Sequence, residues 1–254
     1  MSKQIKVSVV MPVYNGAAYI RQAIDSALDQ DVDLEVLIID DQSTDGLPEV
    51  MKEYEGESRV IWIRNKENMG VARSRNYGVE QARGEYIAFL DADDWWSQDK
   101  LSVQLARMEE LHAVISTTGR ELMNPDSSPV GRSIPVKERI TYKELLKHNS
   151  LSTSSVVVKR DVMLAYPMEH DDSHEDYITW LKIAKAYGWV LGVNEPMLKY
   201  RLSEGSKSRN KWKSAAMTFK VYRYVGLNIF QSIWCFISYA VHGVLKYYGR
   251  AGRM

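Results

Sequence analysis

Short apolar runs alternate with helical spacing of apolar residues in the first part of the chain. The runs have the composition of buried strands and cover residues 7–11, 34–39, 60–63 and 85–90. Helical spacing and capping residues predict the helices between them, over 20–28, from the cap residues 43–45 to about 54, and over 70–82. We therefore expect a parallel sheet with right-handed crossovers, flanked by helices.

The second part of the chain is less regular but mixes the same two patterns. Helical composition marks residues 98–111 and 173–186. Strand-like runs cover residues 113–117, 155–159, 189–193 and 197–201. The turn residues of 124–129 predict a loop. Beyond Lys211 the pattern is helical, so we expect a helical extension after the α/β part.

Composition places the chain among ordinary globular proteins. Its 254 residues are 45% hydrophobic and 26% charged, which suits one large α/β domain with an appendage. The single Cys235 excludes an intramolecular disulfide and fits a reducing compartment. The first residues lead into a strand without the pattern of a secretory signal, so we expect a cytoplasmic protein.

Charge divides the chain into two parts. The net charge is zero, with 33 basic and 33 acidic residues, but residues 205–254 hold nine basic residues and no acidic ones. The preceding residues therefore carry 24 basic and 33 acidic side chains, a net charge of −9. We expect a catalytic domain with a metal site over 1–205 and a basic helical tail over 206–254 that contacts an anionic surface.

An acidic tetrapeptide, residues 91–94 (Asp-Ala-Asp-Asp), follows the fourth strand. Ligands of open α/β sheets bind at the carboxyl ends of the strands, where these carboxylates are expected. Asp91 and Asp93 flank one small residue and can share a hard divalent cation with phosphate oxygens. A capped turn before the next helix explains the same residues, so both interpretations stay open here.

Two further strands carry polar residues to the same edge. The first strand leads into Pro12 and Tyr14, and the second ends at Asp40 and Asp41. An aromatic ring beside a carboxylate acceptor suits a nucleobase, and a metal-binding pair next to it suits a diphosphate. Alternatively, Tyr14 only packs and the aspartate pair only caps the next helix.

Two predicted helix starts carry further candidates for substrate-binding and catalytic residues. Asn68 and Arg75 belong to a basic helix start, which suits a phosphate or ribose; a solvated basic face is the alternative. Asp176 lies at the start of the helix over 173–186. There it is either a general base or, with Ser173, part of a capping box.

Five motifs occur together in a characteristic order, at residues 9–15, 39–46, 68–76, 91–94 and 175–176. They read Val-Val-Met-Pro-Val-Tyr-Asn, Ile-Asp-Asp-Gln-Ser-Thr-Asp-Gly, Asn-Met-Gly with Ala72 and Arg75-Asn76, Asp-Ala-Asp-Asp, and Glu-Asp. Each is weak alone, but the ordered series strongly resembles family 2 inverting glycosyltransferases of the GT-A fold, from about Val7 to Trp180. The resemblance implies a Rossmann-like, mostly parallel sheet flanked by helices, followed by a C-terminal helical extension.

The resemblance also implies roles for single residues. The implied nucleotide-binding residues are Pro12, Tyr14, Asp41, Asn68, Arg75 and Asp91. Asp91 and Asp93 would form the motif for Mg²⁺ or Mn²⁺, with Asp93 the direct ligand. Asp176, beside Glu175, would be the catalytic base. The sequence departs at Gln42, where the family usually has glycine, and we expect this residue to alter the turn beside the nucleobase pocket.

The implied reaction is a single displacement at the anomeric carbon of a nucleotide sugar, with UDP the expected nucleotide. The acceptor would be a glycan hydroxyl, as in relatives that extend polyprenyl-diphosphate-linked oligosaccharides for cell-surface polysaccharide and O-antigen synthesis. We expect no nucleic-acid partner. The alternatives are a sugar-nucleotide-binding module without transferase activity and a nucleotidyltransferase. The latter would need a Gly-rich basic loop after the first strand, but residues 11–16 have one glycine and no basic residue.

Residues 224–245 contain no formal charge and approach the length of a membrane span. Polar residues recur among them near helical spacing, at Asn228, Gln231, Ser232, Ser238 and His242. Such a stripe favours a helix in the membrane interface over a transmembrane one, and basic residues on both sides favour anionic lipids. We therefore expect a peripheral place on the inner face of the cytoplasmic membrane. Packing on the catalytic domain or on a partner subunit is the alternative.

Overall fold

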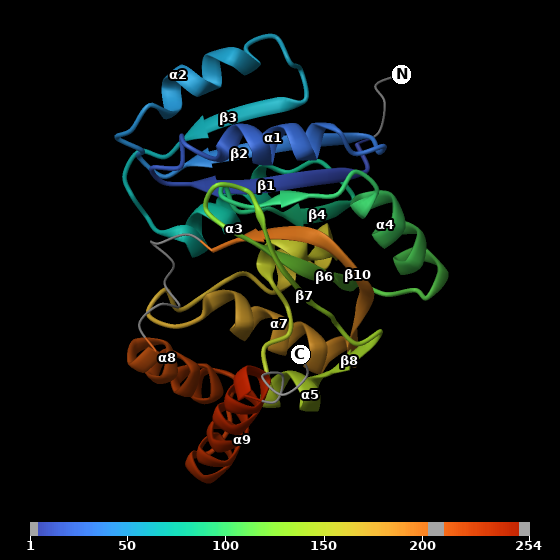
Figure 1. The fold of residues 1–254 in the computed structure, drawn as a ribbon, viewed down its shortest axis with the longest axis vertical. Coiled ribbons are helices and arrows are strands. Elements are labelled where there is room, and N and C mark those ends of the chain that lie inside the picture. Colours follow the sequence, from blue (N-terminus) through green and yellow to red (C-terminus); the bar gives the residue numbers. More distant parts are fainter. Residues whose placement is uncertain (1–4, 203–210, 249–254) are drawn as a thin grey trace.

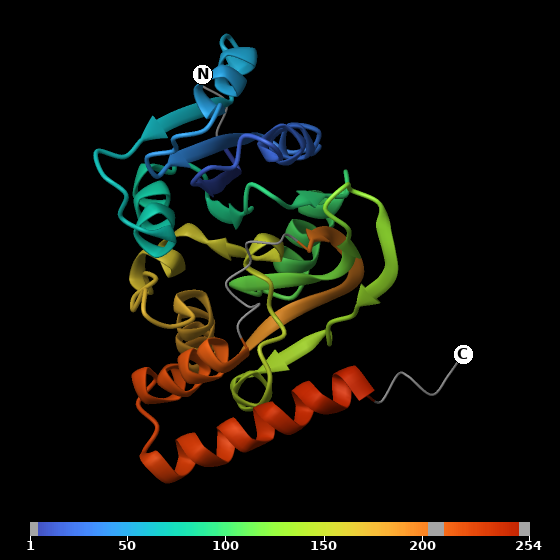
Figure 2. The same cartoon turned by 60° about the vertical axis from the view of Figure 1, so that its left-hand side comes forward.

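Ten strands form one curved sheet in the part of the chain that the computed structural model describes, residues 5–202 and 211–248 (Figures 1 and 2). Their order across the sheet is β3-β2-β1-β4-β9-β6-β10-β5, with β7 beside β6 and β8 beside β10. The strands are β1 (Val7–Val13), β2 (Leu34–Asp40), β3 (Val60–Arg64), β4 (Tyr86–Phe89), β5 (Trp95–Trp96), β6 (Ile115–Met123), β7 (Pro129–Ile134), β8 (Arg139–Thr141), β9 (Val157–Lys159) and β10 (Trp189–Arg201).

The half of the sheet formed by β3, β2, β1 and β4 is parallel, as the alternation of strands and helices predicts. Val7 of β1 lies opposite Leu34 of β2 on one side and Tyr86 of β4 on the other. Every residue of β1, β2 and β4 is buried, because helices cover both faces of the sheet. The carboxyl ends of these strands therefore open at one common edge.

The other half of the sheet mixes strand directions. β9 runs antiparallel between β4 and β6, while β6 and β10 are parallel to each other. The short 3-10 helix η2 (Thr153–Ser155) leads into β9 at the carboxyl edge of β4, so β9 runs back across the sheet. The parallel expectation thus holds for β1 to β4 and for the β6–β10 pair. β5, β7 and β8 add antiparallel pairs.

Two layers of helices cover the sheet. One face, with Val9 and Ile38, packs against α1, α2 and α4, and the other face, with Val10 and Phe89, packs against α3, α5, α6 and α7. These helices are α1 (Ile20–Leu28), α2 (Leu47–Met51), α3 (Val71–Gln81), α4 (Lys100–Glu110), α5 (Tyr142–Lys147), α6 (Arg160–Ala165) and α7 (Glu175–Tyr187). A 3-10 turn, η1 (Lys52–Tyr54), extends α2 to the expected end of that helix.

β10 is a single strand where the pattern predicts two. Its pairing with β6 shifts register between Val193 and Leu198, and residues 194–196 in between are exposed. This polar stretch is therefore an irregularity inside one strand rather than a turn between two strands.

Two helices form the C-terminal part, α8 (Lys211–Tyr224) and α9 (Ile229–Tyr248). α8 packs on the body of the molecule, where Val221 joins the core that contains α7. α9 lies across α8 and α5, at the end of the molecule opposite β3 (Figures 1 and 2). In the described ranges no helix combines the length and the hydropathy needed to cross a membrane.

The polar residues expected as one stripe on the last helix have different environments. Asn228 and Gln231 bond to each other at the start of α9, with N–H to oxygen distances of 3.1 and 2.9 Å. Ser232 is buried, and the side chain of His242 lies outside the described residues. Five large apolar residues are instead exposed among the described side chains of α9, beside the exposed Gln231: Ile229, Phe230, Ile233, Trp234 and Ile237.

Candidate active site

The edge where β1, β2 and β4 end carries the residues predicted to bind a nucleotide. Pro12 is buried within β1 opposite Ile39, and Tyr14 follows the strand with 56% of its surface exposed. The ring of Tyr14 is therefore open to solvent rather than packed in the core. Asp41 follows β2 and joins this edge through its backbone N–H, which donates to the Val13 carbonyl at 2.8 Å.

The Asp41 carboxylate holds the loop that leads into α3. It accepts three N–H groups, from the Asn65 side chain at 2.8 Å and from the Met69 and Gly70 backbones at 2.9 Å each. Asn68 donates to the Asp41 carbonyl at 3.0 Å, so the two predicted residues are in direct contact. Asp41 therefore does not cap the following helix α2. Its two oxygens have room for one further donor.

Gln42 keeps the turn that a glycine would favour. Its φ is +68°, in the left-handed region, which costs a side-chain-bearing residue about 1 kcal/mol. The Gln42 side chain donates to the Asn65 carbonyl and so ties the turn to the loop before α3. Gln42 thus adopts a backbone conformation that favours glycine, and its side chain anchors the turn beside the predicted nucleobase pocket.

Arg75, on α3, joins the ends of two distant segments. Its guanidinium bonds to Asp91 at 2.6 Å and to Glu175, the first residue of α7, at 3.2 Å. Burial alone lowers the pKa of Arg75, but the charges of Asp91 and Glu175 outweigh it and raise that pKa. The buried arginine is therefore a permanent positive charge between the acidic turn and α7, and the solvated basic face is excluded for this residue.

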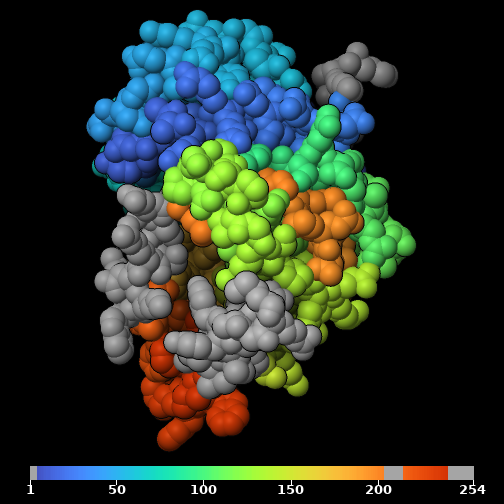
Figure 3. Space-filling model, viewed as in Figure 1, coloured from blue at the N-terminus to red at the C-terminus, as the bar shows by residue number. Residues whose placement is uncertain are grey.

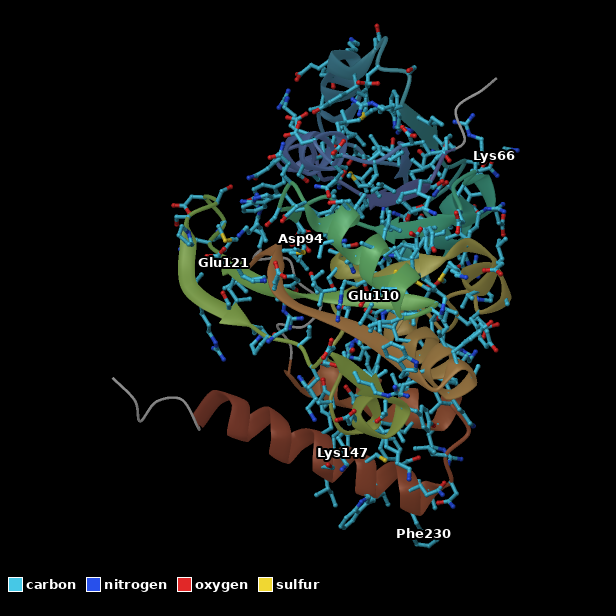
Figure 4. All side chains as sticks on the ribbon, turned by 90° about the vertical axis from the view of Figure 1, so that its right-hand side faces the viewer. Lys66, Asp94, Glu110, Glu121, Lys147 and Phe230 are labelled. Atoms are coloured by element: carbon cyan, nitrogen blue, oxygen red, sulfur yellow. The ribbon has the colours of Figure 1, made fainter. Side chains whose placement is uncertain are left out.

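Residues 91–94 form a tight turn with two kinds of carboxylate. The Asp94 N–H donates to the Asp91 carbonyl at 3.1 Å, and the Asp94 carboxylate is buried and accepts the Arg201 N–H at 2.9 Å. Burial first, and then the charge of Asp93, raise the pKa of Asp94 well above its usual range. Asp91 and Asp93 are only partly buried. Figure 4 labels Asp94 between the two halves of the sheet.

The chemistry of this turn fits a metal ion that arrives with a diphosphate. No group of three or more acidic, histidine or cysteine side chains in the described ranges is arranged to hold a metal ion by itself. Mg²⁺ takes one or two protein carboxylates and completes its shell with phosphate oxygens and water. Asp91 and Asp93 offer such a pair, so turn and metal site are compatible interpretations of the same residues.

Arg201, at the end of β10, fixes the acidic turn from the side opposite Arg75. Its Nε donates to the Asp93 carbonyl at 2.8 Å and its Nη2 to the Gln22 side chain at 2.6 Å. The guanidinium lies between the rings of Tyr19 and Trp95, 4.3 and 4.7 Å from their centroids. The sequence pattern assigns no role to Arg201, because its partners come from segments that only the fold brings together.

Asp176 lies one helical position after Glu175 and close to the same turn. Its carboxylate accepts the Thr153 hydroxyl at 2.7 Å. The next residue of η2, Ser154, accepts the Asp91 N–H at 3.2 Å. η2 therefore spans the predicted metal motif and the predicted base, and the fold brings both together with Arg75.

The capping box that is the alternative interpretation of Ser173 and Asp176 is absent at the start of α7. The N-cap residue is His174, and no side chain caps the helix. Ser173 is fully buried and donates instead to the Met217 carbonyl of α8 at 2.9 Å. Asp176 is thus free of the capping role that would have explained it. Figure 3 shows a hollow on this face of the molecule, with residues of α7 at its floor.

Comparisons with known proteins identify a family for this sequence. The sequence profile of the family described as Glycosyl transferase family 2 matches residues 8–163. TuaG of Bacillus subtilis, described as a glycosyltransferase of teichuronic acid biosynthesis, is 38% identical over 243 residues, 94% of this chain and 96% of that protein. WfaP of Escherichia coli, named UDP-Glc:alpha-D-GlcNAc-diphosphoundecaprenol beta-1,3-glucosyltransferase, is 31% identical over 242 residues, 95% of each chain.

Solved structures with the same fold contain nucleotide sugars. S. aureus TarS in complex with UDP-GlcNAc matches with a TM-score of 0.73 at 20% identity, over 93% of this chain and 72% of that chain. Mannosyltransferase PcManGT from Pyrobaculum calidifontis, in complex with GDP-Man and Mn²⁺, matches with a TM-score of 0.65 at 19% identity. That match covers 100% of this chain and 77% of the mannosyltransferase.

Proposed function

The chain belongs to glycosyltransferase family 2, and from this premise we propose that it moves a sugar from a UDP-linked donor to a polyprenyl-diphosphate-linked glycan. It is a glycosyltransferase with the GT-A fold. WfaP, by its name, transfers glucose from UDP-glucose to GlcNAc-diphosphoundecaprenol, and a second E. coli relative of the same name, WfgD, is 32% identical. These names support the substrate classes that we propose here.

We propose that the donor lies along the common edge of β1, β2 and β4. The exposed Tyr14 ring stacks on the base beside Pro12, and Asp41 accepts a base N–H with its remaining capacity. Asn68 acts on the nucleotide by holding the Asp41 backbone. Arg75 lies behind Asp91, where its charge faces the diphosphate. The diphosphate end of the donor is then next to residues 91–93.

Asp91 and Asp93 are the residues we assign to a divalent cation, Mg²⁺ or Mn²⁺, with Asp93 the direct ligand. When bound, such an ion neutralises the charge that builds on the departing nucleoside diphosphate. The mannosyltransferase neighbour was crystallised with Mn²⁺, which supports the choice of ion class. Arg201 keeps the turn that presents both carboxylates in place.

Asp176 is the base in this proposal, and one observation carries it. Thr153 and Ser154, neighbours in η2, bond to Asp176 and to the Asp91 backbone respectively. The carboxylate thus lies on the same side of the sheet as the diphosphate site, where an acceptor hydroxyl attacks. Asp176 takes the proton of that hydroxyl during a single displacement, which inverts the anomeric carbon.

Substitution of Asp176 by Asn tests the base directly. We expect transfer from UDP-glucose to a GlcNAc-diphosphate lipid to fall by at least a hundredfold, on the order of what a general base contributes. Binding of UDP with Mn²⁺, measured by calorimetry, should stay at the wild-type value, whereas Asp93→Ala should weaken both. Transfer at a normal rate by Asp176→Asn would remove Asp176 from the mechanism.

A screen of UDP-sugars with the wild-type chain tests whether the protein transfers a sugar at all. Mass detection of the extended lipid identifies donor and acceptor together. Binding of UDP without transfer to any lipid-linked acceptor would instead favour a binding module.

We also propose that α9 lies on the inner face of the cytoplasmic membrane. Its outward residues Phe230 and Trp234 are 81% and 74% exposed, and Figure 4 shows Phe230 pointing away from the body. Residues 205–254 hold nine basic residues and no acidic one, so anionic lipid attracts this part of the chain. In this division residues 1–205 carry the substrate-contacting groups, and 206–254 carry the membrane contact.

Flotation with phosphatidylglycerol vesicles tests this contact. Replacing Phe230 and Trp234 by Ser should weaken vesicle binding by more than tenfold, since each large apolar side chain contributes about 1.5–3 kcal/mol when buried. The matched control replaces Trp62 and Leu164, exposed apolar residues outside α9, and should float like wild type. Unchanged flotation of the α9 variant would contradict the proposal. So would loss of a dimer in sedimentation, which would assign the face to a second copy.

A further inference from the structure

The turn over residues 170–174 leads directly into Glu175 and Asp176, and helix α8 covers it. Asp172 accepts the Lys220 ammonium at 2.6 Å and the Tyr224 hydroxyl at 3.1 Å. The fully buried Ser173 donates to the Met217 carbonyl at 2.9 Å. Two successive residues of the turn are thus bonded to three positions along α8.

Two histidines of the turn extend the same contact. The His170 ring stacks on Tyr224, with centroids 3.7 Å apart and planes 5° from parallel. The ring of His174 lies 3.3 Å from the Ser214 carbonyl. The contacts with the turn therefore extend along α8 from Ser214 to Tyr224.

Helix α3 holds the other side of the turn. Asn76 exchanges two hydrogen bonds with the Met168 backbone, at 2.8 and 2.9 Å. A Cβ on Gly70 would lie 3.5 Å from the Asp171 carboxylate, so the turn also lies against the start of α3. The segment before the predicted base is therefore clamped between α3, which carries Arg75, and α8.

These contacts replace the missing cap of α7. His174 is the N-cap residue, but its side chain makes no cap bond, and in the first helical turn the Asp176 carboxylate itself accepts the Tyr177 N–H at 2.7 Å. The start of α7 is held by the bonds of Asp172 and Ser173 to α8, together with the bond of Glu175 to Arg75 of α3. Asp176 lies in the first turn of α7, so these bonds place the backbone that carries its carboxylate, while the Thr153 hydroxyl bonds the carboxylate itself.

We propose that α8 is a positioning element of the active site: through Asp172 and Ser173 it holds the carboxylate of Asp176 at the distance that the acceptor hydroxyl requires. This inference rests on the proposed role of Asp176 as base. A displacement of about 1 Å at a reacting group can cost about a hundredfold in rate. Exposed ion pairs such as Lys220–Asp172 add little to stability. Removing this pair should therefore lower the rate of transfer without much change in the free energy of unfolding.

The test uses the full chain with Ser173→Ala and Lys220→Ala combined. We expect kcat with UDP-glucose and a GlcNAc-diphosphate lipid to fall about tenfold. The KM for UDP-glucose and the affinity for UDP with Mn²⁺ should not change, because the donor edge is held by α3 and the strands. The matched control is Lys137→Ala, which removes a lysine from an ion pair of the same 2.6 Å length with Glu144, and it should keep kcat.

A double-mutant cycle distinguishes positioning from general damage. In the Asp176→Asn background the same two substitutions should cause no further loss of rate, because the group that they position is gone. Wild-type kcat in the Ser173→Ala/Lys220→Ala chain would overturn the role of α8, as would a tenfold loss of UDP affinity or an additive loss in the cycle. Normal transfer by Asp176→Asn would instead overturn the base itself, so the two failures are distinct.

Discussion

At the scale of single residues, two buried arginines hold the acidic turn from opposite sides. Arg75 joins Asp91 to the start of α7, and Arg201 joins the Asp93 carbonyl to Gln22 of α1. A buried arginine keeps its proton at any ordinary pH. The two charges therefore offset the repulsion among the carboxylates of the turn, which a pair of lysines would do less reliably.

Lys100, the first residue of α4, is a buried charge of a different kind. It is fully buried, and its ammonium lies 4.1 Å from the Trp96 ring centroid with no hydrogen-bond partner among the described residues. Burial lowers the pKa of Lys100 well below its usual value. We expect Lys100→Met to raise the free energy of unfolding at pH 7 by about 1–3 kcal/mol, because an unpaired polar group leaves the core.

The pH dependence of the free energy of unfolding tests whether the buried ammonium of Lys100 causes this difference in stability. The pKa of Lys100 is lower in the folded chain than in the unfolded chain, so between the two values the unfolded chain binds more protons. The free energy of unfolding should therefore rise with pH across that window. Urea unfolding at several pH values should show this slope in wild type and in the exposed control Lys52→Met, but not in Lys100→Met. An unchanged slope in Lys100→Met would contradict the assignment.

At the scale of elements, the fit of α3 on the sheet depends on Gly78. A Cβ there would lie 2.5 Å from Val10 and 3.2 Å from Ile39, so the helix lies against β1 and β2 with no space for a methyl group. Arg75 is one turn earlier on the same helix. The close approach of α3 therefore fixes how far Arg75 reaches toward Asp91 and Glu175.

Gly78→Ala measures this fit. Alanine favours a helix over glycine by about 1 kcal/mol, but crowding of the core costs about 1–3 kcal/mol. We expect a net loss in the free energy of unfolding, measured by urea denaturation. Glu80→Ala, on the solvent-exposed side of α3, is the control and should be neutral within about 0.5 kcal/mol. A more stable Gly78→Ala chain would show that α3 has room to move.

At the scale of the whole molecule, the sequence predicts best the parallel half of the sheet, where strands and helices alternate along the chain. β1, β2 and β4 are fully buried runs, and their helices follow directly in the chain, so apolar spacing predicts both. β7 could not be predicted, because it is an exposed edge strand that contains Pro129 and Gly131. The sequence pattern divides β10 in two, because its exposed residues 194–196 have the composition of a turn.

The residues of the candidate site also divide into those that the local sequence pattern predicts and those that only the fold reveals. Asp41, Arg75 and Asp91 lie at strand ends or a helix start, and the parallel sheet brings such positions to one edge. The local pattern at Asp176 suggests a cap, because of its neighbour Ser173, and only the family resemblance favours the role of a base. The partner of Ser173 is Met217, 44 residues away, and only the packing of α8 brings them together. The family resemblance points to the neighbourhood of Arg201, but the bonds of its side chain to Asp93 and Gln22 join segments that only the fold brings together.

Because β9 lies between β4 and β6, the sheet cannot close between these two strands until the ribosome has synthesised β9. β6 ends at Met123, yet its link to β4 is β9, which ends only at Lys159. During synthesis the nascent chain therefore carries two open strand edges for the time needed to add these intervening residues. Such edges can pair with other chains, so this interval is when the newborn protein most needs a chaperone.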